Sequence, residues 1–362
     1  MRSRWLLASL LLAGCAQVAP PIAPSQQSWN DGRASALIGL AGDEYDRSEF
    51  AQARATVDEA IQLAPQSVPA RIISAKLDLQ ADQLETAKAE LDAAKQVDPT
   101  DAEADYLTGV IDQRWKQTDQ AMACYQRASA AEPTNADYLL AYARLQATNG
   151  AADNAIALLR QKLDVFPRNV AIWREIGLLL MRQKQFDAAV QVLTQASNIA
   201  GNDVEIRTEL ARALFNAGQF PNCVQLLSDI LREQATLPGA GSPATQAELR
   251  VELGEALLQC GQPMAAVDAL QRASDLMPDS AAIWLSLARA QIQAADLSGA
   301  EQSLARSTEL SPGDSRCYVL LGYLRLCEHR PAEAREAFGQ AQKLDPADSI
   351  GKSAAAAIDL RE

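Results

Sequence analysis

Small and large apolar residues recur along this chain with a period of 34 residues. Each repeat has two positions that are always small, and a large apolar residue follows four residues after the second. The first small position, numbered 8 in each repeat, holds Ala41, Ala75, Gly109, Ala143, Gly177, Ala211, Gly254, Ala288 and Gly322. The second, position 20, holds Ala53, Ala87, Ala121, Ala155, Ala189, Cys223, Ala266, Ala300 and Ala334. The large residue at position 24 is Val57, Leu91, Tyr125, Leu159, Leu193, Leu227, Leu270, Leu304 or Phe338.

This pattern predicts two antiparallel helices in each repeat. Small residues at positions 8 and 20 let the two backbones approach, and the large residue at position 24 fills the space beside them at helical spacing. Glycines near position 15, at Gly150, Gly218 and Gly261, mark the turn between the helices. One such pair cannot bury its own apolar face, so neighbouring repeats must stack. A fixed period of this length is typical of a solenoid.

A ladder of prolines at position 32 marks the end of each second helix, because proline cannot donate the helical hydrogen bond. The rungs are Pro65, Pro99, Pro133, Pro167, then Gly201 and Ala235, and finally Pro278, Pro312 and Pro346. From Ala235 to Pro278 the step is 43 residues, nine more than the period. The extra residues fall within 236–246, whose Pro and Gly content predicts a loop. Two interpretations remain, a bulge on the convex side of the array, which we favour, or a hinge between six repeats and three.

The pattern resembles the tetratricopeptide repeat (TPR) family, from about residue 33 to Pro346, and Trp173 and Trp284 occupy the family's Trp position 4. Pro263 and Pro331 depart from it at position 17, where an aromatic residue is common. The resemblance implies an all-α fold, a right-handed superhelical solenoid of about nine helix-turn-helix repeats. Residues 349–362 are expected to form one more helix that caps the last repeat. Residues 33–362 would then be one elongated domain.

The first 32 residues are predicted to be a leader and a tether. Arg2 and Arg4 precede an apolar run too short to span a bilayer but suited to a secretory signal over residues 1–14. The sequence Leu-Ala-Gly-Cys that ends at Cys15 resembles a bacterial lipobox, which implies cleavage before Cys15 and its acylation. The alternative is an ordinary signal peptide with an incidental cysteine. Residues 15–32, with three prolines, are expected to hold the solenoid clear of the lipid. Ala16, where an Asp would favour the inner membrane, favours the outer membrane.

Composition argues against several functions. The formal net charge is −13 and no basic run is present, so nucleic-acid binding is not expected. The single histidine, His329, and the lack of metal-ligand spacing among the cysteines give no support for a metal or another cofactor. Five cysteines besides Cys15 are expected to be structural thiols, with Cys223 in the core. No phosphate-binding loop or activated nucleophile is found, so an enzyme is not expected.

In tetratricopeptide proteins the first helix of each repeat lines a concave face through positions 2, 5, 9 and 12. Positions 5 and 12 of this chain are largely apolar, and position 9 is a cation in even-numbered repeats. The predicted partner-binding groove comprises Lys76, Tyr106, Arg144, Arg174, Met181, Arg212, Phe215, Arg289 and Tyr323. We expect it to hold protein or peptide segments that mix apolar and acidic residues. Alternatively, the apolar residues pack between repeats and the cations lie on a solvated face.

These features together predict a lipid-anchored scaffold on the periplasmic side of the outer membrane. It would mediate protein–protein interactions during assembly of an envelope machine, similar to the TPR lipoproteins of tight-adherence pili or the pilotins of secretion systems. The alternative function is an adaptor for cell-wall enzymes or for outer-membrane protein assembly. Contact with the membrane would run through the lipid anchor only.

Overall fold

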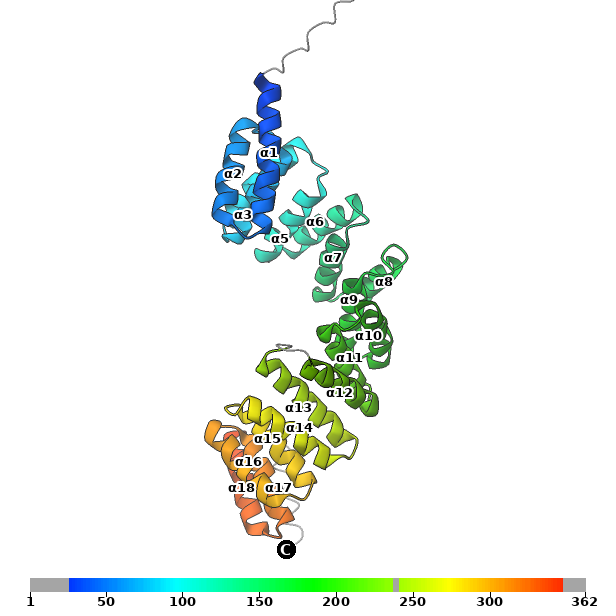
Figure 1. Ribbon diagram of the computed structural model, residues 1–362, viewed down its shortest axis with the longest axis vertical. Coiled ribbons are helices and arrows are strands. Elements are labelled where there is room, and N and C mark those ends of the chain that lie inside the picture. Colours follow the sequence, from blue (N-terminus) through cyan, green and yellow to red (C-terminus); the bar gives the residue numbers. More distant parts are fainter. Residues whose placement is uncertain (1–25, 237–240, 348–362) are drawn as a thin grey trace, which may run out of the picture. The chain divides into compact units, whose positions relative to one another are not determined.

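The computed structural model describes residues 26–236 and 241–347, which form eighteen α-helices and no strand (Figure 1). The first helices of the repeats are α1 (Gln26–Asp46), α3 (Val68–Gln80), α5 (Ala102–Arg114), α7 (Ala136–Thr148), α9 (Val170–Arg182), α11 (Val204–Asn216), α13 (Pro243–Gln259), α15 (Ala281–Gln293) and α17 (Ser315–Cys327). The second helices are α2 (Phe50–Leu63), α4 (Leu84–Val97), α6 (Thr118–Ala131), α8 (Ala152–Gln161), α10 (Phe186–Ala200), α12 (Phe220–Thr236), α14 (Pro263–Leu276), α16 (Leu297–Leu310) and α18 (Pro331–Leu344). The predicted all-α array of helix pairs is confirmed. The predicted leader, the acylated Cys15 and the capping helix of residues 349–362 lie outside the described residues.

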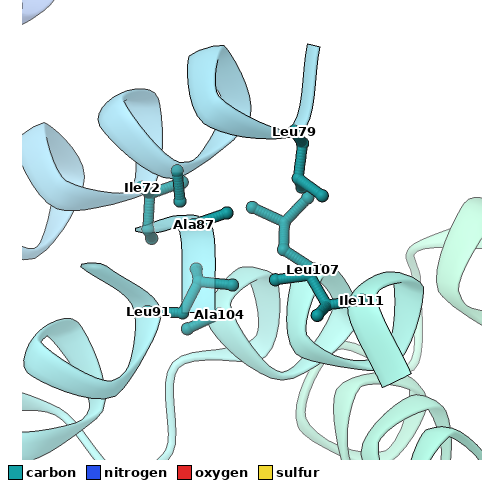
Figure 2. Close-up of a cluster of buried hydrophobic side chains, with 8 residues drawn as sticks. Ile72, Leu79, Ala87, Leu91, Ala104, Leu107 and Ile111 are labelled. Atoms are coloured by element: carbon teal, nitrogen blue, oxygen red, sulfur yellow. The ribbon is translucent and has the colours of Figure 1, made fainter. Parts of the chain in front are cut away.

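The residues at positions 8, 20 and 24 form the core, as the sequence predicts. All nine residues of position 20 and all nine of position 24 are buried. Each helix pair also packs on the next repeat. Figure 2 shows Ala87 and Leu91 of α4 against Ala104, Leu107 and Ile111, all from α5 of the following repeat. The core is therefore a chain of small clusters rather than one central mass, as the physics of stacked repeats requires.

Position 15 adopts the left-handed backbone conformation in every repeat. Three of these residues are the predicted turn glycines, and the other six are Ser48, Asp82, Lys116, Lys184, Ala295 and His329, with φ between 58° and 62°. Each first helix thus ends at a C-cap followed by a single left-handed residue, which reverses the chain into the second helix.

Most second helices end just before a residue of the proline ladder, as predicted. In most repeats the helix stops two residues before the proline, as α2 does at Leu63 before Pro65. Gly201, which replaces proline after α10, stands at φ 66°, so a left-handed glycine ends that helix instead. The two tryptophans at position 4 each donate a hydrogen bond to the ladder proline that precedes them. The indole nitrogen of Trp173 donates to the carbonyl of Pro167 at 3.0 Å, and that of Trp284 donates to the carbonyl of Pro278 at 2.8 Å.

By its internal contacts the chain divides into two compact units, between Leu145 and Gln146 within α7. We call the part up to Leu145 the first unit and the rest the second unit. In the fourth repeat, position 27 is Lys162, where the three preceding repeats have a fully buried alanine (Ala60, Ala94 and Ala128). Helix α8 of this repeat ends at Gln161 after ten residues.

The described ends of the insertion predicted at residues 236–246 are helical. Helix α12 continues to Thr236, and α13 already begins at Pro243, so each has 17 residues where the other repeats have mostly 13 or 14. Ser242 caps α13 by accepting a hydrogen bond from the backbone N–H of Thr245 at 3.1 Å, and Pro243 is favourable in the first turn. These capping residues thus allow part of the inserted sequence to be helical. Its described ends line a cavity together with Thr208 and Arg212 of α11.

Candidate functional site

Residues of the first helices line a series of cavities in each unit, and most position-5 side chains take part. In the first unit, a cavity of about 370 Å³ is lined by Lys76 of α3, by Tyr106 of α5, and by Tyr138, Leu140 and Arg144 of α7. A neighbouring cavity of about 330 Å³ is lined by residues of α1 and α3, among them Tyr45 and Ile72, and again by Lys76. Lys76 and Arg144 share position 9, two repeats apart, and Tyr106 and Leu140 share position 5 of successive repeats, so stacking of the repeats brings all four to one cavity.

The second unit has three such cavities. The largest, about 760 Å³, lies between α11, α12 and α13, and Thr208 and Arg212 line it. A second of about 470 Å³ is lined by residues of α15 and α17, including Leu285, Arg289 and Val319. The third, about 260 Å³, contains Phe215 and Val251. The predicted groove residues Arg212, Phe215 and Arg289 therefore border hollows on the first helices of this unit.

Aromatic side chains give the first-unit cavity a rigid wall. The ring of Tyr106 stacks on that of Tyr138 with centroids 4.9 Å apart, and it also contacts the ring of Tyr125 at 5.7 Å. Burial raises the pKa of Tyr106, so this phenol stays neutral in the physiological range. In the second unit Phe215 packs edge-on against Phe220 at 5.4 Å.

The predicted groove cations are paired with glutamates of neighbouring repeats. Lys76 pairs with Glu103 of the next first helix, and Arg174 pairs with both Glu205 and Glu209. The guanidinium of Arg212 contacts Glu252 at 2.6 Å. Arg289 pairs in the opposite direction along the chain, with Glu255 of the preceding repeat.

These pairs change the expected charge of the groove. Unpaired cations along the groove would attract acidic segments, but each of these four is compensated within the molecule. A partner carboxylate would have to displace a glutamate that is already in place. The pairs join successive first helices, so they also help to set the stacking of the repeats.

The apolar position-5 residues form two groups. Some pack between repeats, and others are accessible to a bound segment. Ile72, Leu140 and Leu285 are buried, with exposures of 4%, 4% and 8%, and serve mainly as packing between repeats. Tyr106, Val251 and Val319 are half-buried and stay accessible to a bound segment. Three predicted groove residues, Arg174, Met181 and Tyr323, do not line any of the five cavities described above. The Tyr323 ring instead packs edge-on against Phe338 at 5.5 Å.

Sequence reasoning missed the carboxylates of this surface. Glu103, Glu205 and Glu248 occupy position 2 of their repeats, while Glu209 and Glu252 occupy position 6, one helical turn further on. The recurrence at position 2, which the resemblance also places on the concave face, was the signal that could have revealed them. Positions 2 and 6 lie on the same side of a helix as position 9.

The cysteines behave largely as predicted. Cys223 is buried, and burial raises the pKa of its thiol to about 12, which makes it unreactive. Cys327 is exposed and free, two residues before His329. Within residues 26–236 and 241–347, no cluster of three or more His, Cys, Asp and Glu side chains is arranged to hold a metal ion. None of the helices described is both long and apolar enough to cross a bilayer.

Comparison with known families gives the same assignment as the geometry. Tetratricopeptide repeat models match residues 45–111, 147–203, 180–238 and 257–324, and a second model of the same description matches residues 116–163. These matches cover well over half of the chain, so the chain belongs to the tetratricopeptide repeat family. No curated protein sequence matches it.

The chain is similar to several solved structures, of which the first described here supports the fold. The C-terminal part of a TPR repeat-containing protein from Cytophaga hutchinsonii aligns with a TM-score of 0.53 and 16% identity, covering 69% of this chain and 98% of that one. A tetratricopeptide repeat protein from Parabacteroides merdae aligns at 0.46 and 16%, with 81% and 99% covered. MamA from Desulfovibrio magneticus aligns at 0.44 and 19%, with 50% and 97% covered.

Proposed function

We propose that this protein is a lipid-anchored periplasmic scaffold that holds segments of other proteins along the first helices of its repeats. The observation that carries the proposal is that cavities lie on those helices in each unit, with half-buried apolar residues and paired charges at their rims. Tetratricopeptide repeats typically serve as non-catalytic interaction modules, and stacked repeats provide an extended surface suited to a chain segment.

The anchoring half of the proposal is supported by the sequence alone. Leu-Ala-Gly before Cys15 and the proline-containing tether after it fit a lipoprotein leader. A machine of the cell envelope, such as a pilus or a secretion system, is the setting in which an outer-membrane TPR scaffold would act during assembly. We therefore infer that its partners are subunits or assembly factors of such a machine.

Blocking the cavities tests the scaffold role. Ala141 lines the 370 Å³ cavity of the first unit and Ser286 lines the 470 Å³ cavity of the second, and both are half-buried. The variants Ala141→Arg and Ser286→Arg each fill a cavity with a long side chain. The same substitution at Ala305, exposed on α16, adds the same charge away from the cavities.

We expect the wild type and the Ala305→Arg control to co-purify the same proteins from the native cells, and at least one of the two cavity variants to lose them. The melting temperatures should stay close to that of the wild type, which separates blockage from unfolding. If both cavity variants retained all proteins captured by the control, the first helices would not be the binding surface.

A further inference from the structure

The 760 Å³ cavity of the second unit is acidic. Five glutamates line it, at positions 205, 209, 233, 248 and 252, against a single cation, Arg212. Two arginines outside the lining reach some of them, since Arg174 pairs with Glu205 and Glu209, and Arg207 pairs with Glu233. With these two arginines included, five carboxylates are balanced by three cations. Within the part of the chain that the structure describes, Glu248 has no ion-pair partner.

Two hydrogen-bond acceptors of this cavity lack a protein donor among the described residues. Gln234 of α12 is only 7% exposed, and its buried Oε1 atom receives no hydrogen bond. Glu252 uses Oε1 for its contact with Arg212, while its buried Oε2 atom is also without a partner. Leaving buried acceptors unpaired is costly, so such atoms point to a ligand that donates hydrogen bonds.

We propose that this cavity binds a lysine or arginine side chain of a partner segment that lies along α11 and α13. The inference rests on the proposed scaffold function. It specifies in addition that the partner segment carries a positive charge where it meets this cavity. Ammonium and guanidinium groups carry several donors and no acceptor, which matches acceptors that lack donors. They also complement the excess carboxylates, whereas an acidic segment would meet like charge.

Both described ends of the connection between α12 and α13 border the cavity. Thr236, Gly241 and Thr245, at its described ends, line the cavity together with residues of α11 and α13. Gly241 adopts φ 81° and passes so close to Gln234 that an added Cβ would lie 3.3 Å from its Nε2 atom. The Gln234 amide therefore lies in the wall of the cavity, beside Gly241.

The free protein holds these charges at some cost. Glu248 and Glu252 are four residues apart on α13, where like charges destabilise a helix. Burial raises the pKa of Glu252, and the charge of Glu248 raises it further. A bound cation would relieve both effects, so the arrangement favours the complex over the free state.

A photo-crosslinking experiment in the native cells tests the inference on the full chain. Benzoylphenylalanine is placed at Thr245, exposed at the cavity, at Ser286 in the 470 Å³ cavity, and at Gln225, exposed on α12 outside the cavities. Mass spectrometry then identifies the partner segment joined at each position. We expect the segment captured at Thr245 to contain Lys or Arg, and Gln225 to capture no partner segment.

Charge variants then test the contact with the captured segment as a synthetic peptide. Glu248→Gln should weaken its binding about threefold, and Glu248→Gln with Glu252→Gln about tenfold, as measured by fluorescence anisotropy. Glu336→Gln, which removes an equally exposed glutamate of α18, should leave affinity unchanged.

The outcomes separate this inference from the scaffold function. A captured segment without Lys or Arg, unchanged affinity in the double variant, or capture at Ser286 but not at Thr245 would overturn the basic-segment inference while the scaffold function stands. Absence of capture at both Thr245 and Ser286 would contradict both.

Discussion

The aromatic ring of Phe338 lies directly over the backbone of Gly322. A Cβ atom built on Gly322 would stand 2.5 Å from Phe338 Cε1, closer than real Cβ contacts come. The same relationship joins position 8 to position 24 in the three other repeats with glycine at position 8, including Gly109 and Tyr125 at 2.7 Å. Glycine at position 8 therefore makes room for the side chain at position 24, and both aromatic residues found at position 24 occur in such repeats.

We predict that Gly322→Ala destabilises the protein by about 1–2 kcal/mol, because the new methyl group overpacks against Phe338 by more than the gain in helix propensity returns. The urea midpoint measures this. Gly339→Ala on α18 is the matched control, since its added Cβ meets no atom within 4 Å, and it should stabilise by about 1 kcal/mol.

The contact between Gly322 and Phe338 can also be tested by a double-mutant cycle. In a Phe338→Leu background, Gly322→Ala should cost clearly less than in the wild type, because the smaller side chain can shift away. Additive effects of the two substitutions would show that Gly322 and Phe338 do not share one space.

The fold could be predicted because one repeat occurs nine times, so the residue type at each small or large position can be compared across nine copies. The early end of α8 at Gln161 was not predicted, because how far a helix extends depends on its neighbours as well as on its own sequence. The ion pairs could not be predicted from the sequence for a different reason. Lys76 reaches position 2 of the next repeat and Arg212 reaches position 6, whereas Arg289 reaches backwards. Such offsets depend on side-chain conformation and stacking, which a list of aligned positions does not contain.

A stabilising substitution follows from the left-handed turn residues. Ala295 adopts φ 62°, a conformation that costs an L-residue with a Cβ about 1–2 kcal/mol. Ala295→Gly should raise the free energy of unfolding by up to about 1 kcal/mol, after the greater entropy of glycine in the unfolded chain is counted. Gly261→Ala, at the same position of the seventh repeat with φ 68° and open space around it, should lower stability by a similar amount. Midpoints of unfolding that moved the same way in both variants would contradict this account.

Asp105 is a buried carboxylate that depends on two cations. It is 3% exposed and lies 2.5 Å from Lys95 Nζ and 2.8 Å from an Arg127 guanidinium nitrogen. Burial alone would raise the pKa of Asp105, but hydrogen bonds and charge from Arg127 and Lys95 outweigh it and lower the pKa. Asp105→Asn should therefore cost on the order of 2 kcal/mol at pH 7. Asp92→Asn, at an exposed i,i+4 pair with Lys88, should change stability by less than about 0.5 kcal/mol.

The pH dependence of that difference has a definite sign. A carboxyl group whose pKa is lower in the folded state stabilises the protein above its unfolded pKa of about 3.9, and this stabilisation is lost as the pH falls through the folded value. The gap in unfolding midpoint between wild type and Asp105→Asn should thus be constant from pH 7 to about 5 and shrink below about pH 4. A gap that widened in acid would reverse the assigned pKa shift.

Cys15 provides the test of the proposed anchor. Acyl chains on its sulfur and amino group would hold the protein on the membrane through several chains, whereas one chain binds only marginally. Cys15→Ser should therefore move the protein from the membrane pellet to the soluble fraction after cell lysis. Cys327→Ser, which removes an exposed thiol of α17, is the matched control and should leave the distribution unchanged. The fractionation uses high salt without detergent, which removes proteins held by charge alone. If the Cys15→Ser protein still sedimented with the membranes under these conditions, acylation of Cys15 would not be the anchor.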